Sequence, residues 1–315
     1  MTTTEAQRTL VLPAVLVAAL SGALIAAQGR FNGDLSTAGA GALVTTWLSY
    51  VGTLVTTAIV LVVQGRAART AHTLRHDARW WWYAVGLCGV PIVIMFAIGI
   101  PIVGVAIASV CSVAGQTVSG LALDARGVGL PAPLHLTRRR LGAAFVALAG
   151  LVVAVGAGPT TNLGTAIGLG VAIFLGGMLI SGQQAGNGRV TQLTGNPVLP
   201  ALTSSAGGTV AVTVILGVAA ATGHLHGVHL PGQWWLYLGG PLGAAITVCA
   251  AWAIRHLGTF ALTLGVVVGQ MVTAVLVDLG TGVGARWATL AAVVLVTGAT
   301  MLVVVPRRVV AAVPR

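Results

Sequence analysis

Ten long apolar runs constrain the fold of this chain more than any other feature. Each run has about 20 residues, the length that an α-helix needs to cross roughly 30 Å of hydrocarbon. Hydrophobic residues make up 57% of the 315 residues and charged residues only 7%, and a soluble fold could not bury so much apolar surface. The predicted transmembrane helices are 10–30, 40–63, 81–99, 101–123, 140–158, 163–185, 197–221, 234–253, 256–278 and 286–305.

The arginines predict how these helices are oriented. With the N-terminus inside, fourteen of the 16 basic residues fall on the cytoplasmic side, and only Arg30 and Arg286 fall outside. Cytoplasmic loops of membrane proteins collect basic residues, so both termini are expected in the cytoplasm. The same rule accounts for the net charge of +11, and no nucleic-acid partner is expected. Membrane lipids are expected as partners, because the basic loop 64–79 suits anionic headgroups.

The second half of the sequence repeats the first. Residues 22–55 align without gaps with 177–210 at nine of 34 positions, and 80–124 align with 234–278 at fourteen of 45. The identities include Gln, Asn, Asp and Trp, which apolar low complexity does not readily align. Two domains of five helices are therefore predicted, 1–158 and 159–315. Because five is odd, the second domain must cross the membrane inverted, as in secondary transporters built from inverted repeats.

Three short motifs occur once in each domain and in the same order: Q-x3-N-G, S-x2-G and G-Q-x7-D. They comprise Gln28, Asn32, Gly33, Ser49, Gly52, Gly115, Gln116 and Asp124 in the first domain, and Gln183, Asn187, Gly188, Ser204, Gly207, Gly269, Gln270 and Asp278 in the second. In these motifs the chain resembles the drug/metabolite transporter (DMT) superfamily, most closely its YdcZ-type bacterial inner-membrane branch. The resemblance implies an all-α, ten-helix integral membrane carrier of EamA-like fold, an exporter in the bacterial cytoplasmic membrane.

This chain lacks an acidic residue that some members of the superfamily use. Small multidrug carriers of the superfamily use a glutamate within their first helix to exchange protons for cations. The corresponding stretches here read ALSGALIAA at 19–27 and FLGGMLISG at 174–182, without an acid. Proton-for-drug exchange of that kind is therefore not expected, and uncharged midspans favour a neutral, zwitterionic or mixed-polarity solute.

The amide side chains are the candidate substrate-binding residues. Gln28 and Asn32 are four residues apart and share a helix face, as do Gln183 and Asn187. Polar side chains in membrane helices face the bundle interior or a water-filled path, which favours a solute pathway. Hydrogen bonding between helices and capping of a helix end are the alternatives. The inversion places the first pair toward the outside and the second toward the inside.

The remaining candidates lie on the fourth helix of each domain. Gln116 precedes Asp124 by eight residues, about 12 Å of helix, and so approaches the middle of the bilayer. Gln270 does the same from the other side, and both glutamines either line the substrate cavity or pack. Asp124 and Asp278 lie one near each membrane face. They either pair with an arginine (Arg126 or Arg286) or end a helix, or they act in proton coupling or gating.

These residues predict a secondary transporter that moves a small organic metabolite or drug by alternating access. A lipid-handling, flippase-like protein and a non-transporting scaffold are the alternatives. No enzyme is expected, because the spans hold no Ser-His-Asp, His-rich or paired-carboxylate constellation. No cofactor is expected, and no metal, since three histidines at 224–229 without an acid are a weak signal. A monomer suffices to build the pathway, and a homodimer is the alternative.

Overall fold

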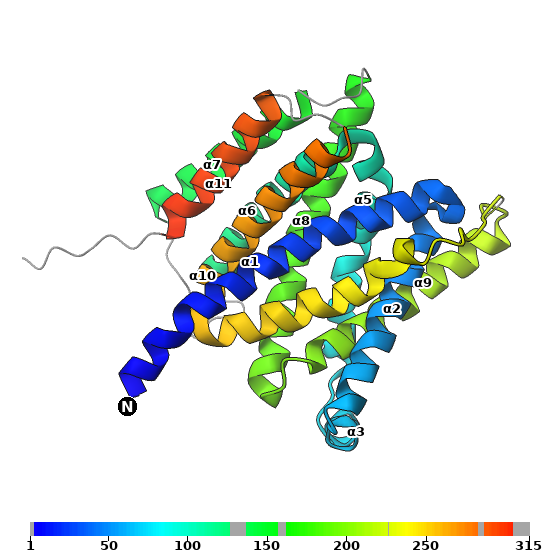
Figure 1. Ribbon diagram of the computed structural model, residues 1–315, viewed down its shortest axis with the longest axis vertical. Helices are drawn as coiled ribbons and strands as arrows, with labels where there is room; N and C mark the ends of the chain where they lie inside the picture. Colours follow the sequence, from blue (N-terminus) through cyan, green and yellow to red (C-terminus); the bar gives the residue numbers. More distant parts are fainter. Residues whose placement is uncertain (1–2, 127–136, 157–161, 226, 283–286, 305–315) are drawn as a thin grey trace, which may run out of the picture.

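The computed structural model describes residues 3–126, 137–156, 162–225, 227–282 and 287–304, and every regular element within them is helical (Figure 1). The helices are α1 (Thr3–Leu35), α2 (Gly41–Val63), α3 (Ala67–His76), α4 (Trp80–Ala84), α5 (Val90–Val103), α6 (Val105–Ala125), α7 (Arg138–Gly156), α8 (Leu163–Thr194), α9 (Leu199–Ala221), α10 (Gly239–Gly280) and α11 (Trp287–Val304). Three short helical turns join them: η1 (Ser36–Ala40), η2 (Val85–Gly89) and η3 (Trp234–Leu238).

Six stretches of these helices are long and apolar enough to cross a membrane: Leu12–Val63, Trp80–Val103, Val105–Leu123, Leu163–Thr194, Leu199–Ala221 and Trp234–Ala253. They overlap seven of the ten predicted spans, because the first stretch contains two. Shorter apolar helices, Arg140–Gly156 and Gly265–Gly280, coincide with two more. The structure is thus that of an all-helical membrane protein, and the number of ten spans stays a prediction.

The chain turns from α1 into α2 without a polar loop. The first predicted span ends at residue 30, but α1 continues to Leu35 and is followed by the π-helical turn η1. Gly39 in this turn has φ of 125°, which L side chains rarely adopt. A Cβ on Gly39 would also collide with the ring of His229, and the backbone N–H of His229 donates to the Gly39 carbonyl at 3.1 Å. The turn therefore requires glycine.

Helix α10 contains two limbs that run in opposite directions. Its 42 residues would measure about 63 Å if straight, twice the hydrocarbon thickness. Figure 1 shows the first limb, which starts at Gly239, running back along α1. The second limb returns in the opposite direction, also beside α1. Contacts with α1 agree: Gln28 meets Gly239 and Ser21 meets Ile246, whereas Ala18 meets Gly265 and Gly22 meets Val266. The predicted spans 234–253 and 256–278 lie on these two limbs.

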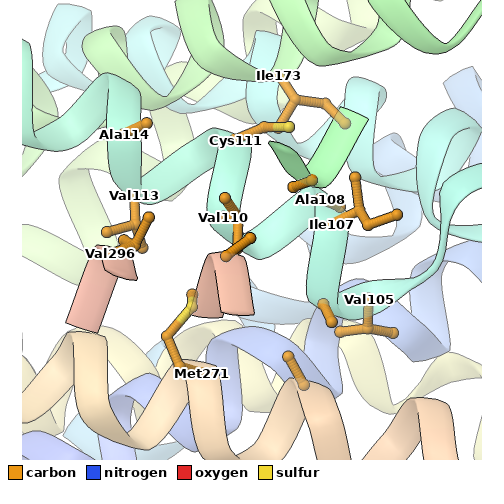
Figure 2. Close-up of a cluster of buried hydrophobic side chains, with 14 of the residues drawn as sticks. Val105, Ile107, Ala108, Val110, Cys111, Val113, Ala114, Ile173, Met271 and Val296 are labelled. Carbon is orange, nitrogen blue, oxygen red and sulfur yellow. The ribbon is translucent and has the colours of Figure 1, made fainter. Parts of the chain in front are cut away.

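Helix α6 forms the centre of the hydrophobic core. Residues 103–115, which are mostly apolar, are buried without interruption, as expected for a helix that other helices enclose on every side. Figure 2 shows Val105, Val110 and Val113 on α6 packed with side chains from three other helices. The partners labelled there are Ile173 of α8, Met271 of α10 and Val296 of α11.

Several helices touch at their backbones, among them α1 with α10 and α6 with α8. On α1 and α10, a Cβ on Gly22 would collide with the Val266 carbonyl, and one on Gly269 would collide with the Ala19 carbonyl. On α6 and α8, Gly177 stands in the same relation to the Ser112 carbonyl, and Gly115 to the Phe174 carbonyl. Small residues allow such close approach of membrane helices, where lipid gives no hydrophobic force between them.

The first prediction concerns such a crossing. Gly269→Ala should lower the free energy of unfolding by about 1–3 kcal/mol, because the added methyl meets backbone that cannot move aside alone. Thermal unfolding of the purified protein in detergent measures this. Gly168→Ala on α8 is the matched control: its Cβ would meet open space, and it should leave stability equal or raise it by about 0.5–1 kcal/mol. Equal effects of the two substitutions would contradict the close crossing.

Candidate functional site

Gln116 on α6 and Gln270 on α10 lie in different surroundings. Gln270 is fully buried, and neither atom of its amide group has a hydrogen-bond partner among the described residues. Gln116 is half-buried, and its Nε2 donates to Ser112 Oγ at 3.2 Å. The backbone carbonyl of Gln116 also accepts a hydrogen bond from Ser181 Oγ at 3.1 Å.

Sequence differences between the two units explain why Gln270 lacks partners. Ser112 is the residue that the Gln116 amide bonds, and adding 154 to its position gives 266, which holds valine. Val266 offers the Gln270 amide no hydroxyl in the corresponding place, whereas Ser181 bonds only the backbone carbonyl of Gln116. Burying an amide without partners costs about 1–3 kcal/mol for each unsatisfied group. The Gln270 amide is thus a polar group that the fold alone does not satisfy.

Gln28 and Asn32 are engaged in bonds between helices. Gln28 Nε2 donates to the Gly239 carbonyl at 2.8 Å and lies 3.5 Å from Ser49 Oγ. Asn32 is buried, and its Nδ2 donates to Ser49 Oγ at 3.3 Å. The pair therefore ties α1 to α2 and to the first limb of α10, which is the helix–helix alternative for these residues.

Gln183 and Asn187 make no equivalent bonds. Gln183 is half-buried, and its buried Oε1 has no partner in the part of the chain that the structure describes. Asn187 is half-buried, and no side-chain hydrogen bond connects it to another described residue. The two predicted amide pairs thus differ in their hydrogen bonding, although their sequence motif is the same.

Asp278 caps another helix. Its Oδ1 accepts the Val105 N–H at 2.8 Å and its Oδ2 accepts the Ala106 N–H at 2.7 Å, at the start of α6. The first N–H groups of a helix have no partner within it, and the helix dipole favours negative charge there. α6 starts here because Gly104, with φ of 87°, breaks it from α5. The carboxylate is buried and satisfied by backbone, an arrangement that no local sequence signal indicated.

The described residues show no ion pair between either aspartate and the arginine predicted to pair with it. Arg286, the predicted partner of Asp278, and the side chain of Asp124 lie outside the described residues. Arg30 interacts electrostatically with Asp278, but its ion pair is with Asp34, at 2.8 Å between Nε and Oδ2. Asp34 lies four residues along the same helix, so this pair is local.

Tyr50 is a residue that the sequence reasoning missed. Its phenol ring is buried beside the unsatisfied Gln183, and its hydroxyl donates a long, 3.4 Å hydrogen bond to the Gly86 carbonyl. The one available signal was a difference within the repeat, since position 205 of the second unit holds serine.

The described residues contain no group of three or more His, Cys, Asp or Glu side chains that could hold a metal ion. In the histidine-rich loop, His224 Nδ1 lies 2.9 Å from Thr222 Oγ1, and His226 falls outside the described part.

Several helices long and apolar enough to cross a membrane define a multi-pass membrane protein. The family described as "Putative inner membrane exporter, YdcZ" matches the chain twice, over residues 13–153 and 168–304. The chain belongs to this family, which confirms the resemblance seen in the motifs. A solved structure described only as "Crystal structure of protein" is 17% identical over 94% of this chain and 96% of its own, with a TM-score of 0.56. That similarity shows a shared fold. Among curated proteins, none matches the chain.

The second prediction tests the cap. Asp278→Asn should lower the free energy of unfolding by about 1–3 kcal/mol, because one amide oxygen cannot replace two carboxylate oxygens and an N–H of α6 loses its partner. Thermal unfolding measures the loss. Asp34→Asn is the control, since its partly exposed pair with Arg30 contributes about 0.2–1 kcal/mol or less. An Asp278→Asn protein of unchanged stability that lost only pH-driven uptake would favour the coupling role instead.

Proposed function

We propose that the protein is a secondary transporter, and not an enzyme, that moves a small organic metabolite or drug across the bacterial cytoplasmic membrane by alternating access. Its ten transmembrane helices form two inverted five-helix units, with both termini in the cytoplasm. The family supports export across the inner membrane. The arginine distribution supports the orientation.

One observation carries the proposal: the same backbone contacts occur twice. Gly22 meets Val266, and its counterpart Gly177, at 22 plus 155, meets Ser112, at 266 minus 154. Gly269 meets Ala19, and the residues at the corresponding positions, Gly115 and Phe174, also meet. Two related crossings in one chain support two related bundles. In inverted-repeat transporters such bundles rock about a site near the bilayer midplane.

Gln116 and Gln270 are the proposed central contacts of the solute. The polar side chains beside Gln116 are the serines Ser112 and Ser181, which suit hydrogen bonding rather than ion pairing. Gln270 carries an unsatisfied amide that a solute or water could satisfy in another state of the cycle. Asp124 remains a candidate for coupling or gating, and so does Asp278 beside its role as a cap.

A transport screen tests the function. The purified chain is reconstituted in proteoliposomes and offered a broad panel of neutral, zwitterionic and charged metabolites, with and without a proton gradient. Accumulation of a defined solute, together with a solute-dependent rise in melting temperature, is the expected result. Absence of both across the panel would refute the transporter.

The third prediction separates function from packing at Gln270. Gln270→Met should raise the melting temperature, because an unbranched apolar side chain replaces an unsatisfied amide, yet it should reduce flux of the solute found in the screen at least tenfold. Gln116→Met is the control and should lower the melting temperature, because it removes the bond to Ser112. A stabilised Gln270→Met protein with full flux would show that Gln270 only packs.

A lipid-handling protein is the second candidate, favoured by a cleft of about 490 Å³ between α10 and α11. The cleft is apolar, as a path for acyl chains would be, and lies on segments expected at the depth of the hydrocarbon. Its lining residues are Val268, Met271, Val272, Val275, Leu276, Val293, Val294, Thr297 and Gly298.

A fourth prediction decides between the candidates. If lipid passes through the cleft, Gly298→Leu should slow the exchange of fluorescent phospholipid between the leaflets of proteoliposomes, because the added side chain fills the apolar space. Uptake of a soluble solute should stay the same. If the wild-type protein exchanges no lipid at all, the lipid-handling function is wrong.

A further inference from the structure

The two copies of the Gln-Asn-Ser motif are bonded differently. We call Gln28, Asn32 and Ser49 the first set, and Gln183, Asn187 and Ser204 the second set. In the first set, Ser49 Oγ accepts from Asn32 Nδ2 at 3.3 Å, and Gln28 reaches the Gly239 carbonyl. In the second set, the serine bonds within its own helix instead: Ser204 Oγ donates to the Pro200 carbonyl at 2.6 Å. In the second set, the buried Oε1 of Gln183 has no partner among the described residues, and no hydrogen bond joins the Asn187 side chain to another described residue.

A single pair of aligned positions explains this difference. Gly239 stands beside the first set, and a Cβ there would collide with Asn32 Oδ1. The corresponding position in the other unit, 239 minus 154, holds Val85. The side chain of Val85 lies against Gly186, the residue before Asn187, with its Cγ1 3.0 Å from where a Cβ on Gly186 would stand. The first set closes because glycine leaves room, and valine prevents the second set from closing in the same way.

Tyr50 adds an aromatic hydroxyl to the second set alone. Its hydroxyl lies 2.6 Å from the point where a Cβ on Gly89 would stand, and Gln183 Oε1 lies still nearer to that point. The phenol oxygen and the unpartnered amide oxygen therefore both lie close to the same backbone position. In the other unit, Gln28 meets Gly243 in the corresponding place, but position 205 holds serine in place of tyrosine.

We propose that the second set and Tyr50 form a binding site for a neutral solute that carries an amide or hydroxyl group, and that the first set only holds helices together. This inference rests on the proposed transport function and names its substrate class. Gln183 Oε1 accepts a hydrogen bond from the solute, while the Asn187 amide donates and accepts. A charged group would find no counter-ion among the described residues of this site, and burial of a charge without one is strongly unfavourable. Arg189, the nearest charge along α8, is exposed and bonds to Gln192.

Binding of matched probes to the purified full-length chain tests the site. Benzamide, benzoate and benzylamine share one ring and differ in charge, and their dissociation constants are measured by calorimetry at neutral pH. Benzamide should bind at least tenfold more tightly than the two ions. Equal or tighter binding of either ion, or no binding of benzamide, would overturn the proposed ligand class.

Paired substitutions in the two sets then assign the contacts. Gln183→Leu and Asn187→Leu should each weaken benzamide binding about tenfold while the melting temperature holds, because neither amide has a partner to lose. Gln28→Leu and Asn32→Leu should do the reverse, lowering the melting temperature with little change in binding. Tyr50→Phe should weaken binding about fivefold without loss of fold. The opposite pattern, or equal effects in both sets, would refute the site.

Val85→Gly tests the cause of the asymmetry. Without the valine side chain, Asn187 can approach Ser204 as Asn32 approaches Ser49, so benzamide binding should weaken. Unchanged binding would show that Val85 does not hold the site open. A flux measurement distinguishes failure of the site from failure of the proposed transport function. Benzamide binding without uptake of any solute would refute transport but leave the binding site supported. Uptake of a solute that ignores Gln183 and Asn187 would remove the site and keep transport.

Discussion

Contact between helix backbones at glycine is the interaction on which the rest of this structure depends. Lipid tails are as apolar as the side chains of the helices, so helices gain stability from close packing rather than from leaving the solvent. Gly22 and Gly269 bring α1 against α10, and Gly115 and Gly177 bring α6 against α8. Each crossing stands a few residues from a candidate amide. A small change in these contacts would therefore move the polar residues as well as destabilise the fold.

The second constraint is that backbone groups need partners inside a membrane. No water is available in the hydrocarbon core, so a break in a helix exposes N–H groups that another part of the protein must satisfy. Gly104 makes such a break, and Asp278 satisfies the first two N–H groups of α6. This accounts for a buried carboxylate in an apolar interior through the need of the backbone. An acid in a membrane helix is thus no sufficient sign of proton coupling.

The sequence predicted the parts of this protein that depend on local pattern. Apolar runs predicted the helical class and most spans, and the aligned Gln, Asn and Asp identified the motifs of the family. It did not predict that α1 continues through Arg30 to Leu35, because an ion pair four residues apart keeps those charges on one helix face. It could not predict the Asp278 cap, because the partners are 173 and 172 residues away.

Duplication also explains why the candidate site could not be read from the motifs alone. The motif residues are the same in both units, and their bonding is decided by neighbours that differ: glycine or valine at 239 and 85, serine or valine at 112 and 266. Once two units are joined in one chain, each can change its neighbours independently. One amide can then be bound into the scaffold while its counterpart remains unsatisfied. The free energy that an unsatisfied amide costs in the resting protein is recovered when a ligand binds it, which makes the unpaired copy the better place to expect a solute.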